Sequence, residues 1–247
     1  MAHVLIVGES WITNETHYKG FDQFTSATLR SGVAPLREAL ESGGYEVHWM
    51  PSHEAQEGFP LRVGELSAID VLILSDIGAN TLLLHPDTWL RGQPTPNRLK
   101  LIREWVMGGG ALVMCGGYYS FQGINAGAFY HGTPVEEVLP VRISPYDDRV
   151  EAPEGASAEV LQPKHPILGE IDGEWPVLLG YNRVEPAPGS TTLVRINGDP
   201  LLVIGNSGEG KTLAWTSDIG PHWCPESFTS WEGYNRLWSQ ATRWLCM

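Results

Sequence analysis

Basic residues are scarce in this sequence, and their scarcity excludes two classes of partner. The chain has 16 Lys and Arg against 29 Asp and Glu, which gives a formal net charge of -13. A nucleic acid needs a basic face on the protein that can displace its counterions, and anionic membranes are disfavoured for the same electrostatic reason. We therefore expect neither nucleic acid nor membrane among the partners of this protein.

Cysteine is scarce as well, because the 247 residues include only three, Cys115, Cys224 and Cys246. Their number is odd and no two have CxxC spacing, so neither a disulfide framework nor a zinc cluster is indicated. No pair among the eight histidines has metal-ligand spacing either. We expect reduced thiols, no metal and no cofactor.

Long hydrophobic runs are also missing. The apolar segment at residues 3–7 is too short for a signal peptide or a membrane span, and no basic leader precedes it. We therefore expect a cytoplasmic protein. With 42% hydrophobic and 18% charged residues, the chain reads as a globular protein that can bury a proper core.

Short apolar runs alternate with helical patterns over the first 140 residues. Predicted strands lie at residues 3–7, 45–50, 71–74 and 111–115. Predicted helices cover residues 35–42 and a segment that Thr95 caps, with Pro96 at its first position. This alternation predicts a parallel, doubly wound α/β sheet. Residues 9–31 are expected to form a long polar loop, and Thr133 to open a capping box for a short helix beginning near Pro134.

The second half of the chain differs in character. Frequent Pro and Gly and alternating segments predict β-rich structure from residue 141, and an amphipathic stripe over 231–245 predicts a helix that packs back on the sheet. We expect a single domain over residues 1–247, with a parallel core at 1–140, a β-rich extension at 141–220 and a closing C-terminal helix at 221–247.

One motif suggests a nucleotide site that its context does not support. Residues 205–212 match the phosphate-loop pattern GxxxxGK[ST], but a phosphate loop leads into a helix, and the residues that follow here are strand-like. We therefore predict a hairpin turn between two strands.

The tetrapeptide Ser-Asp-Ile-Gly occurs twice, at residues 75–78 and 217–220, each time after an apolar strand. If both strands run in the same direction, Asp76 and Asp218 lie at one carboxyl edge, which is where open α/β sheets bind ligands. The turn after Cys115 faces the same edge, so these three loops predict a site.

Cys115 has two interpretations. The turn Gly116-Gly117 follows it directly, and backbone N–H groups there could lower the thiol pKa or hold an oxyanion, with Gly78 as a second donor. Alternatively, Cys115 is a small buried hydrophobic residue at the end of a strand.

A cysteine nucleophile also needs a general base. His222 is the best placed histidine, because it follows a predicted strand end and has Asp218 and Glu226 nearby in sequence. His17 and His131 lie on loops near other strand ends and are second choices. A structural role is equally consistent with each of the three imidazoles.

Three motifs carry a resemblance to a known family: GGYYSFQG at 116–123, the segment 130–140, and SDIGPHW at 217–223. Together they resemble the class I glutamine amidotransferase-like superfamily, in a branch near the trehalose-utilisation-type proteins. The resemblance spans nearly the whole chain and implies a flavodoxin-like three-layer α/β sandwich.

In active members of that superfamily, a nucleophile elbow G-x-C-x-G and a histidine followed by Pro-Glu complete a Cys-His-Glu triad that releases ammonia from glutamine. The resemblance implies these roles for Cys115, His222 and Glu226. This sequence has Val113 at the first elbow glycine, and two further residues separate His222 from Pro225.

Two functions remain open, and whether the protein is an enzyme depends on the choice. The first is binding of a small polar molecule that contains sugar or amide groups, without glutaminase activity, which the incomplete elbow favours. The residues expected at this site are Asp76, Gly78, Asn80, Gly116, Gly117, Tyr118, Ser120, Trp11, His17, His131, Asp218 and His222, with Tyr119 and Phe121 as further stacking groups.

The second possible function is that of a cysteine-dependent hydrolase or amidotransferase, in which Cys115 attacks, His222 relays the proton, and Glu226 or Asp218 orients the imidazole. A homo-oligomer is compatible with both.

Overall fold

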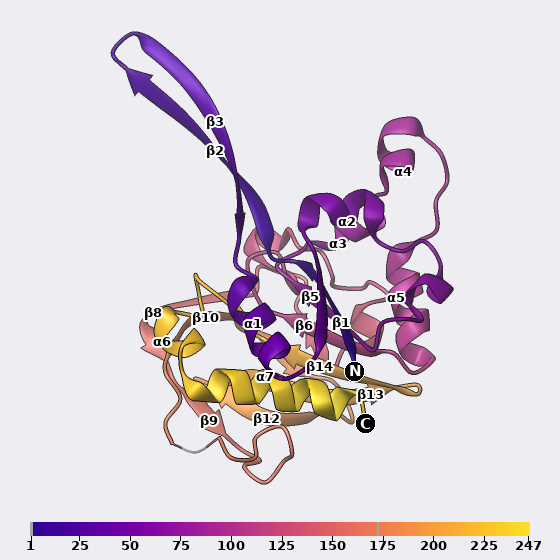
Figure 1. Ribbon diagram of the computed structural model, residues 1–247, viewed down its shortest axis with the longest axis vertical. Helices are drawn as coiled ribbons and strands as arrows, with labels where there is room; N and C mark the ends of the chain where they lie inside the picture. The colour runs from indigo at the N-terminus through magenta and orange to yellow at the C-terminus, as the bar shows by residue number, and fades with distance from the viewer. Residues whose placement is uncertain (1, 172) are drawn as a thin grey trace.

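An eight-stranded sheet forms the centre of the computed structural model, which describes residues 2–171 and 173–247 (Figure 1). The first five strands in spatial order are parallel, and the last three are antiparallel to their neighbours. Their order is β4 (Glu46–Met50), β1 (His3–Gly8), β5 (Val71–Ser75), β6 (Ala111–Cys115), β14 (Gly210–Trp215), β13 (Asp199–Ser207), β12 (Thr191–Ile196) and β9 (Ala158–Val160). The predicted, mostly parallel α/β sheet is confirmed.

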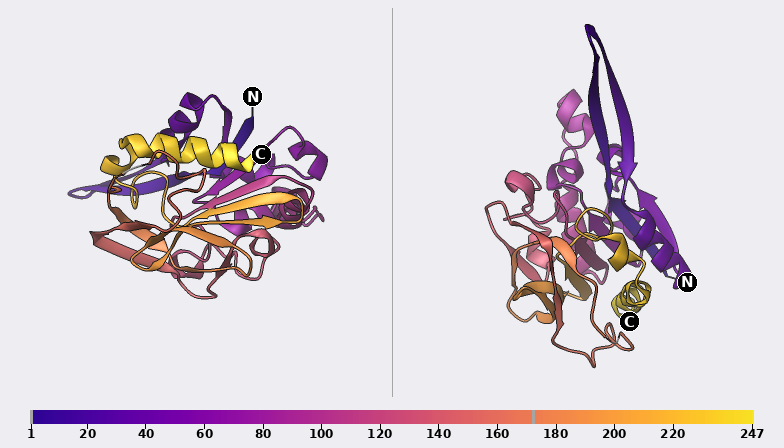
Figure 2. Two further views of the ribbon diagram at one scale, coloured as in Figure 1. Left: turned by 90° about the horizontal axis from the view of Figure 1, so that it is seen from below. Right: turned by 90° about the vertical axis from the view of Figure 1, so that its left-hand side faces the viewer.

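Helices cover both faces of this sheet, which gives the predicted three-layer sandwich (Figures 1 and 2). On one face, α1 (Ala34–Ser42) and α7 (Glu232–Leu245) pack together against Val4 and Ile6. On the other face, Leu5 and Val7 contact the layer formed by α2 (Ser52–Gly58), α3 (Ala79–Leu83) and α5 (Arg98–Met107). Successive residues of β1 therefore point to opposite cores.

The central strands are apolar along their whole length because both of their faces are covered. All residues of β5 and β6 are buried, and this is why short continuous apolar runs predict them. The helix stripe predicted near the C-terminus is buried as expected, with Tyr234, Leu237 and Trp238 in the core beneath α7.

The second half of the chain is rich in strands, as predicted, and it shares the central sheet with the first half. β14 lies between β6 and β13, and β13 and β14 form the hairpin expected at residues 205–212 in place of a phosphate loop. The other elements are the strand pairs β7 (Val141–Ile143) with β11 (Val184–Pro186) and β8 (Arg149–Ala156) with β10 (Leu178–Asn182), the short helices α4 (Pro86–Arg91) and α6 (Glu226–Thr229), and the 3-10 turns η1 (Val63–Leu66), η2 (Ile124–Ala126) and η3 (Glu136–Val138).

The prediction of a long loop at residues 9–31 is wrong. These residues form a long hairpin of β2 (Ser10–Lys19) and β3 (Asp22–Ser31), which projects away from the body of the protein (Figures 1 and 2). The prediction failed because both strands are largely exposed to solvent. Their sequences therefore lack the regular alternation of apolar and polar residues that marks a half-buried strand. Cross-strand pairs of β-branched residues, such as Thr13 with Thr28 and Thr16 with Thr25, favour strand pairing instead.

Two predicted helix starts are also wrong. Helix α5 begins at Arg98, because the Asn97 side chain accepts from two backbone N–H groups of the first turn, whereas Thr95 bonds to Thr88. The short helix expected from about Pro134 begins at Glu136 instead, as the 3-10 turn η3. The capping box does not form, because the Glu136 side chain accepts from the backbone N–H groups of Gly132 and Ile143.

Within the part of the chain that the structure describes, no helix has the length and apolar character needed to span a bilayer.

Candidate functional site

Four parallel strands, β1, β5, β6 and β14, deliver polar groups to one edge of the sheet. β5 and β14 each run parallel to β6, so the two Ser-Asp-Ile-Gly segments do follow strands of the same direction, as the sequence analysis required. Asp76 and Asp218 interact electrostatically, because the Asp218 carboxylate is one of the groups that raise the pKa of Asp76. The carboxyl edge of the sheet is therefore the candidate site.

Glu9 is a member of this site that the sequence analysis missed. It directly follows β1, has a positive φ of 52°, and is 1% exposed. Its carboxylate accepts from the Ser75 hydroxyl at 2.6 Å, and its backbone N–H donates to the Ser75 carbonyl at 2.7 Å. A Cβ atom on Gly32 would come within 2.4 Å of Glu9 Oε1, so any larger residue at position 32 would have to displace the Glu9 carboxylate.

The pKa of Glu9 lies well above its ordinary value. Burial is the largest cause, and the nearby carboxylates of Asp218 and Asp76 raise the pKa further. Glu9 is therefore held towards the protonated form, in which a carboxyl group can donate a hydrogen bond.

Asp76 is held in place by hydrogen bonds to the turn after β6. Its Oδ1 accepts from the Tyr119 N–H at 2.7 Å, and its own N–H donates to Ser120 Oγ at 3.1 Å. Gly117 has a φ of 145°, and a Cβ there would lie 2.9 Å from Asp76 Oδ1. Burial and the Asp218 carboxylate raise the pKa of Asp76 to about 6. The structure thus brings together Asp76, Gly117 and Ser120, which the sequence analysis had grouped.

His222 pairs with Asp218 across 3.6 Å between Nδ1 and Oδ2. The Asp218 side chain is 5% exposed and that of His222 is 51% exposed, so the imidazole reaches solvent from a buried carboxylate. The Asp218 carboxylate raises the pKa of His222 against the opposing effect of burial. Glu226, the other predicted partner of His222, lies exposed in the first turn of α6, and the ion pair of His222 is with Asp218.

Aromatic rings border His222 on two sides. The Tyr118 ring meets the imidazole edge-on, with centroids 4.2 Å apart, and Trp223 lies parallel to it at 5.8 Å. Glu151, from β8, accepts from both the Tyr118 hydroxyl and the Trp223 indole N–H. Glu151 is the second site residue that the sequence did not reveal, because no motif surrounds it.

Cys115 lies beneath the site and is completely buried. Burial, followed by the carboxylates of Glu9 and Asp218, raises its thiol pKa well above the ordinary value. The backbone N–H of Gly116 donates to the carbonyls of Trp215 and Ser217, and that of Gly117 donates to Asn182 Oδ1. The N–H groups of Gly116 and Gly117, which were expected to face the sulfur or an oxyanion, therefore bond to the protein itself.

Several predicted ligand-binding residues lie elsewhere. His17 bonds to Ser26 and stacks on Phe24 along the hairpin, whereas Trp11 lies at the root of the same hairpin, two residues after Glu9. Phe121 is completely buried and cannot stack on a ligand. Gly78, in contrast, lies against the ring of the half-exposed Tyr119, and Asn80 is exposed on α3.

His131 belongs to a neighbouring cavity of about 1270 Å³. Its Nδ1 pairs with the Ile143 carbonyl at 2.8 Å. Four of the charged groups that line this cavity are joined in ion pairs, Arg149 with Asp147 and Arg183 with Asp199. Asp76, Asp218 and His222 do not line it, and we take the carboxyl edge, where these three converge, as the candidate site.

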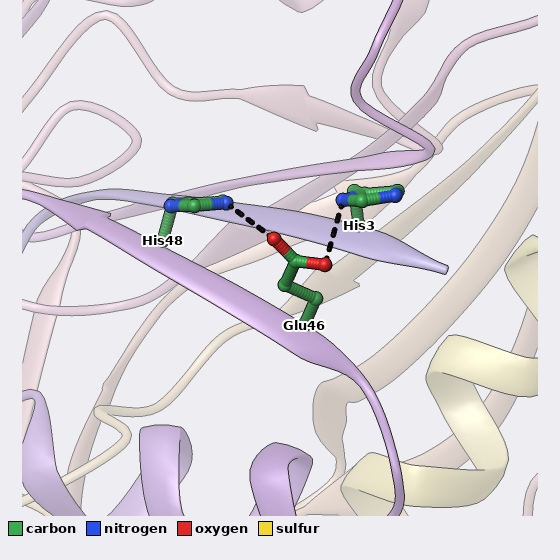
Figure 3. A group of neighbouring side chains, drawn as sticks. All are labelled: His3, Glu46 and His48. Carbon is green, nitrogen blue, oxygen red and sulfur yellow. Dashed lines mark hydrogen bonds and ion pairs between the residues drawn. The ribbon is translucent and has the colours of Figure 1, made fainter. Parts of the chain in front are cut away.

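A second cluster of histidine and carboxylate groups lies at the opposite, amino-terminal edge of the sheet (Figure 3). Glu46 stands between two imidazoles, 3.4 Å from His3 Nδ1 and 3.2 Å from His48 Nε2. All three side chains are about half exposed. Their donor atoms lie within 4.8 Å of one another, a spacing that could hold a metal ion, and the two ion pairs alone account for the arrangement.

The chain belongs to a family of class I glutamine amidotransferase-like proteins. The family model, described as "Putative glutamine amidotransferase", matches residues 3–247. No curated protein matches the chain. The resemblance inferred from the three motifs is therefore confirmed for the family.

Solved structures support the same assignment. A cytoplasmic protein from Salmonella typhimurium is 43% identical, with 98% of both chains covered and a TM-score of 0.94. A second one, from Salmonella typhimurium LT2, is 42% identical, with 98% of this chain and 99% of that chain covered and a TM-score of 0.93. A ThuA-like protein from Parabacteroides merdae ATCC 43184 shares the fold at 13% identity and a TM-score of 0.59, over 100% of this chain and 90% of that one. The two Salmonella descriptions agree with the cytoplasmic location expected from the sequence.

Proposed function

We propose that this cytoplasmic protein binds a small polar molecule at the carboxyl edge of its sheet and does not release ammonia from glutamine. The observation that carries the proposal is the convergence of Asp76, Asp218 and His222 above Cys115, which is completely buried. Convergent polar groups with displaced pKa values are typical of binding and catalytic sites.

The charge of the site restricts the ligand. The Asp218 carboxylate raises the pKa of Glu9 and of Asp76, and Asp76 raises that of Glu9, so an anionic ligand would add to the repulsion. Carboxylate oxygens accept hydrogen bonds, and the half-exposed Tyr119 ring beside Gly78 offers an apolar face. A neutral molecule rich in hydroxyl or amide N–H donors, such as a sugar, a polyol or a primary amide, fits this combination.

A thermal-shift screen followed by calorimetry tests the proposal. Neutral sugars, polyols and amides are compared with sugar phosphates and carboxylates. We expect binding within the neutral set only, and at least tenfold weaker binding by Asp76→Asn and His222→Ala. Glu38→Gln, which removes an exposed carboxylate on α1, is the matched control and leaves affinity unchanged. Equal binding to the Asp76→Asn variant, or preference for phosphates, contradicts the proposal.

The competing function is a cysteine-dependent hydrolase or amidotransferase. The His222–Asp218 pair favours it, because a histidine oriented by a buried carboxylate is half of the required triad. The state of Cys115 opposes it, since a nucleophile needs a thiolate and the thiol here is buried among carboxylates that raise its pKa.

Thiol titration separates the two functions. Cys246 is exposed and would react in any case, so the experiment uses Cys246→Ser as its background. We expect no reaction of Cys115 in the folded protein at neutral pH and full reaction after unfolding, with no glutaminase activity. Rapid labelling that Cys115→Ala abolishes would overturn the proposal in favour of the hydrolase.

A further inference from the structure

The β2–β3 hairpin carries all of its charged residues on one face, together with uncharged residues that include Trp11, His17 and Phe24, and none on the other face. Cross-strand neighbours share a face and successive residues alternate, so the register divides the hairpin into two sets. One face, called here the charged face, carries all four charged residues of the hairpin, Glu15, Lys19, Asp22 and Arg30. The other face, called here the uncharged face, is formed by the pairs Ser10/Ser31, Ile12/Leu29, Asn14/Ala27, Thr16/Thr25 and Tyr18/Gln23.

The uncharged face is open to solvent. Ile12 is 57% exposed, Leu29 is 51% exposed and Tyr18 is 73% exposed, and β2 and β3 pair only with each other among the described strands. An isolated two-stranded ribbon is at best marginally stable in water, and it normally needs a layer against its apolar face. The exposed Ile12, Leu29 and Tyr18, on a face that has no charged residue to keep it in water, predict that a second layer covers the uncharged face.

Charge indicates what that layer is. The whole chain has a formal net charge of -13, so two copies repel over most of their surface. The hairpin itself is neutral, because Glu15 and Asp22 balance Lys19 and Arg30. It is therefore a place where two copies can meet without that repulsion. An uncharged face also offers nothing to a strongly charged partner.

We propose that two copies of this chain associate through the uncharged faces of their β2–β3 hairpins, packed face to face about a two-fold axis. A two-fold axis uses the same surface on both copies, and a face without charge meets its own copy without repulsion. Packed two-stranded layers about 10 Å apart would bury Ile12, Leu29 and Tyr18 of both chains and leave the charged faces in solvent.

Sedimentation equilibrium and light scattering of matched variants test this proposal. The wild type is expected at twice the chain mass of 27.2 kDa. The double variant Ile12→Lys/Leu29→Lys, on the uncharged face, is expected to be a monomer, with association weakened at least 100-fold. Thr13→Lys/Thr28→Lys introduces the same charge at the adjacent cross-strand pair of the charged face and is expected to remain a dimer.

A single substitution removes doubt about folding. Tyr18 lies near the hairpin tip and is largely exposed, so Tyr18→Lys leaves the fold intact and is expected to weaken association at least tenfold. The proposal is overturned by a monomeric wild type at 100 μM protein, which would assign the face to a different partner. It is equally overturned if both double variants dissociate, if neither does, or if Tyr18→Lys has no effect.

Discussion

The two ends of the parallel sheet carry similar chemical groups in different surroundings. At the carboxyl edge, His222 pairs with an Asp218 side chain that is 5% exposed, and at the amino edge, two histidines pair with a Glu46 side chain that is 47% exposed. Only the first cluster lies beside further carboxylates, the buried Glu9 and the partly buried Asp76. Proximity of histidine and carboxylate is therefore common to both ends, and what distinguishes the site is desolvation, which displaces pKa values and strengthens electrostatic interactions.

The largest effect on stability is expected from a substitution that disrupts the contacts between Asp76 and the turn after β6. In Gly117→Ala, the new Cβ meets Asp76 Oδ1 at 2.9 Å and the residue must keep a φ of 145°, so we expect a loss of about 3 kcal/mol in the free energy of unfolding. Gly64→Ala is the control, since nothing lies within 4 Å of a Cβ there. Urea denaturation measures both, and equal stabilities of the two variants would contradict the close contact with Asp76.

A smaller effect, dependent on pH, is expected from Asp76→Asn. The pKa of Asp76 rises from 3.8 to about 6 on folding, so the native protein binds the proton more tightly than the unfolded chain does. Its contribution to stability is present below pH 4 and is lost as the pH rises through 6. The asparagine does not titrate. We therefore expect similar stabilities at pH 4, and a variant more stable by about 2 kcal/mol at pH 8.

Glu9 and His222 are present in both proteins, but the Asp76 carboxylate raises the pKa of each, so the substitution also lowers these two pKa values. Thermal unfolding across pH 4 to 8 is the measurement. A stability difference that is the same at all pH values would show that Asp76 does not carry a displaced pKa.

The smallest effect is expected at the amino edge. Glu46→Gln removes the charge between His3 and His48, but exposed ion pairs contribute little, so we expect a change of about 0.5 kcal/mol or less, which 0.5 M NaCl abolishes. Denaturation at low and high salt measures it. A loss above about 2 kcal/mol would remove the contrast between the two ends.

The sequence predicted the parts of the molecule that bury continuous or periodic apolar residues. The strands ending at Ser75 and Cys115 and the stripe of α7 fall in this class, and the repeated Ser-Asp-Ile-Gly then placed Asp76 and Asp218 at one edge. Glu9 and Glu151 were missed because their roles depend on distant segments that only folding brings near. The burial of Cys115 is likewise a tertiary property, since strand-end position alone fits both an exposed and a sealed thiol.

The chain enters and leaves the β2–β3 hairpin at a single point, because the Gly32 N–H donates to the Glu9 carbonyl at 3.2 Å. In topological terms the hairpin is an excursion between β1 and α1. Removal of residues 11–30 would leave every strand pair of the eight-stranded sheet in place. The length of the hairpin can therefore change without a change in the pairing of the strands that form the carboxyl edge at its root.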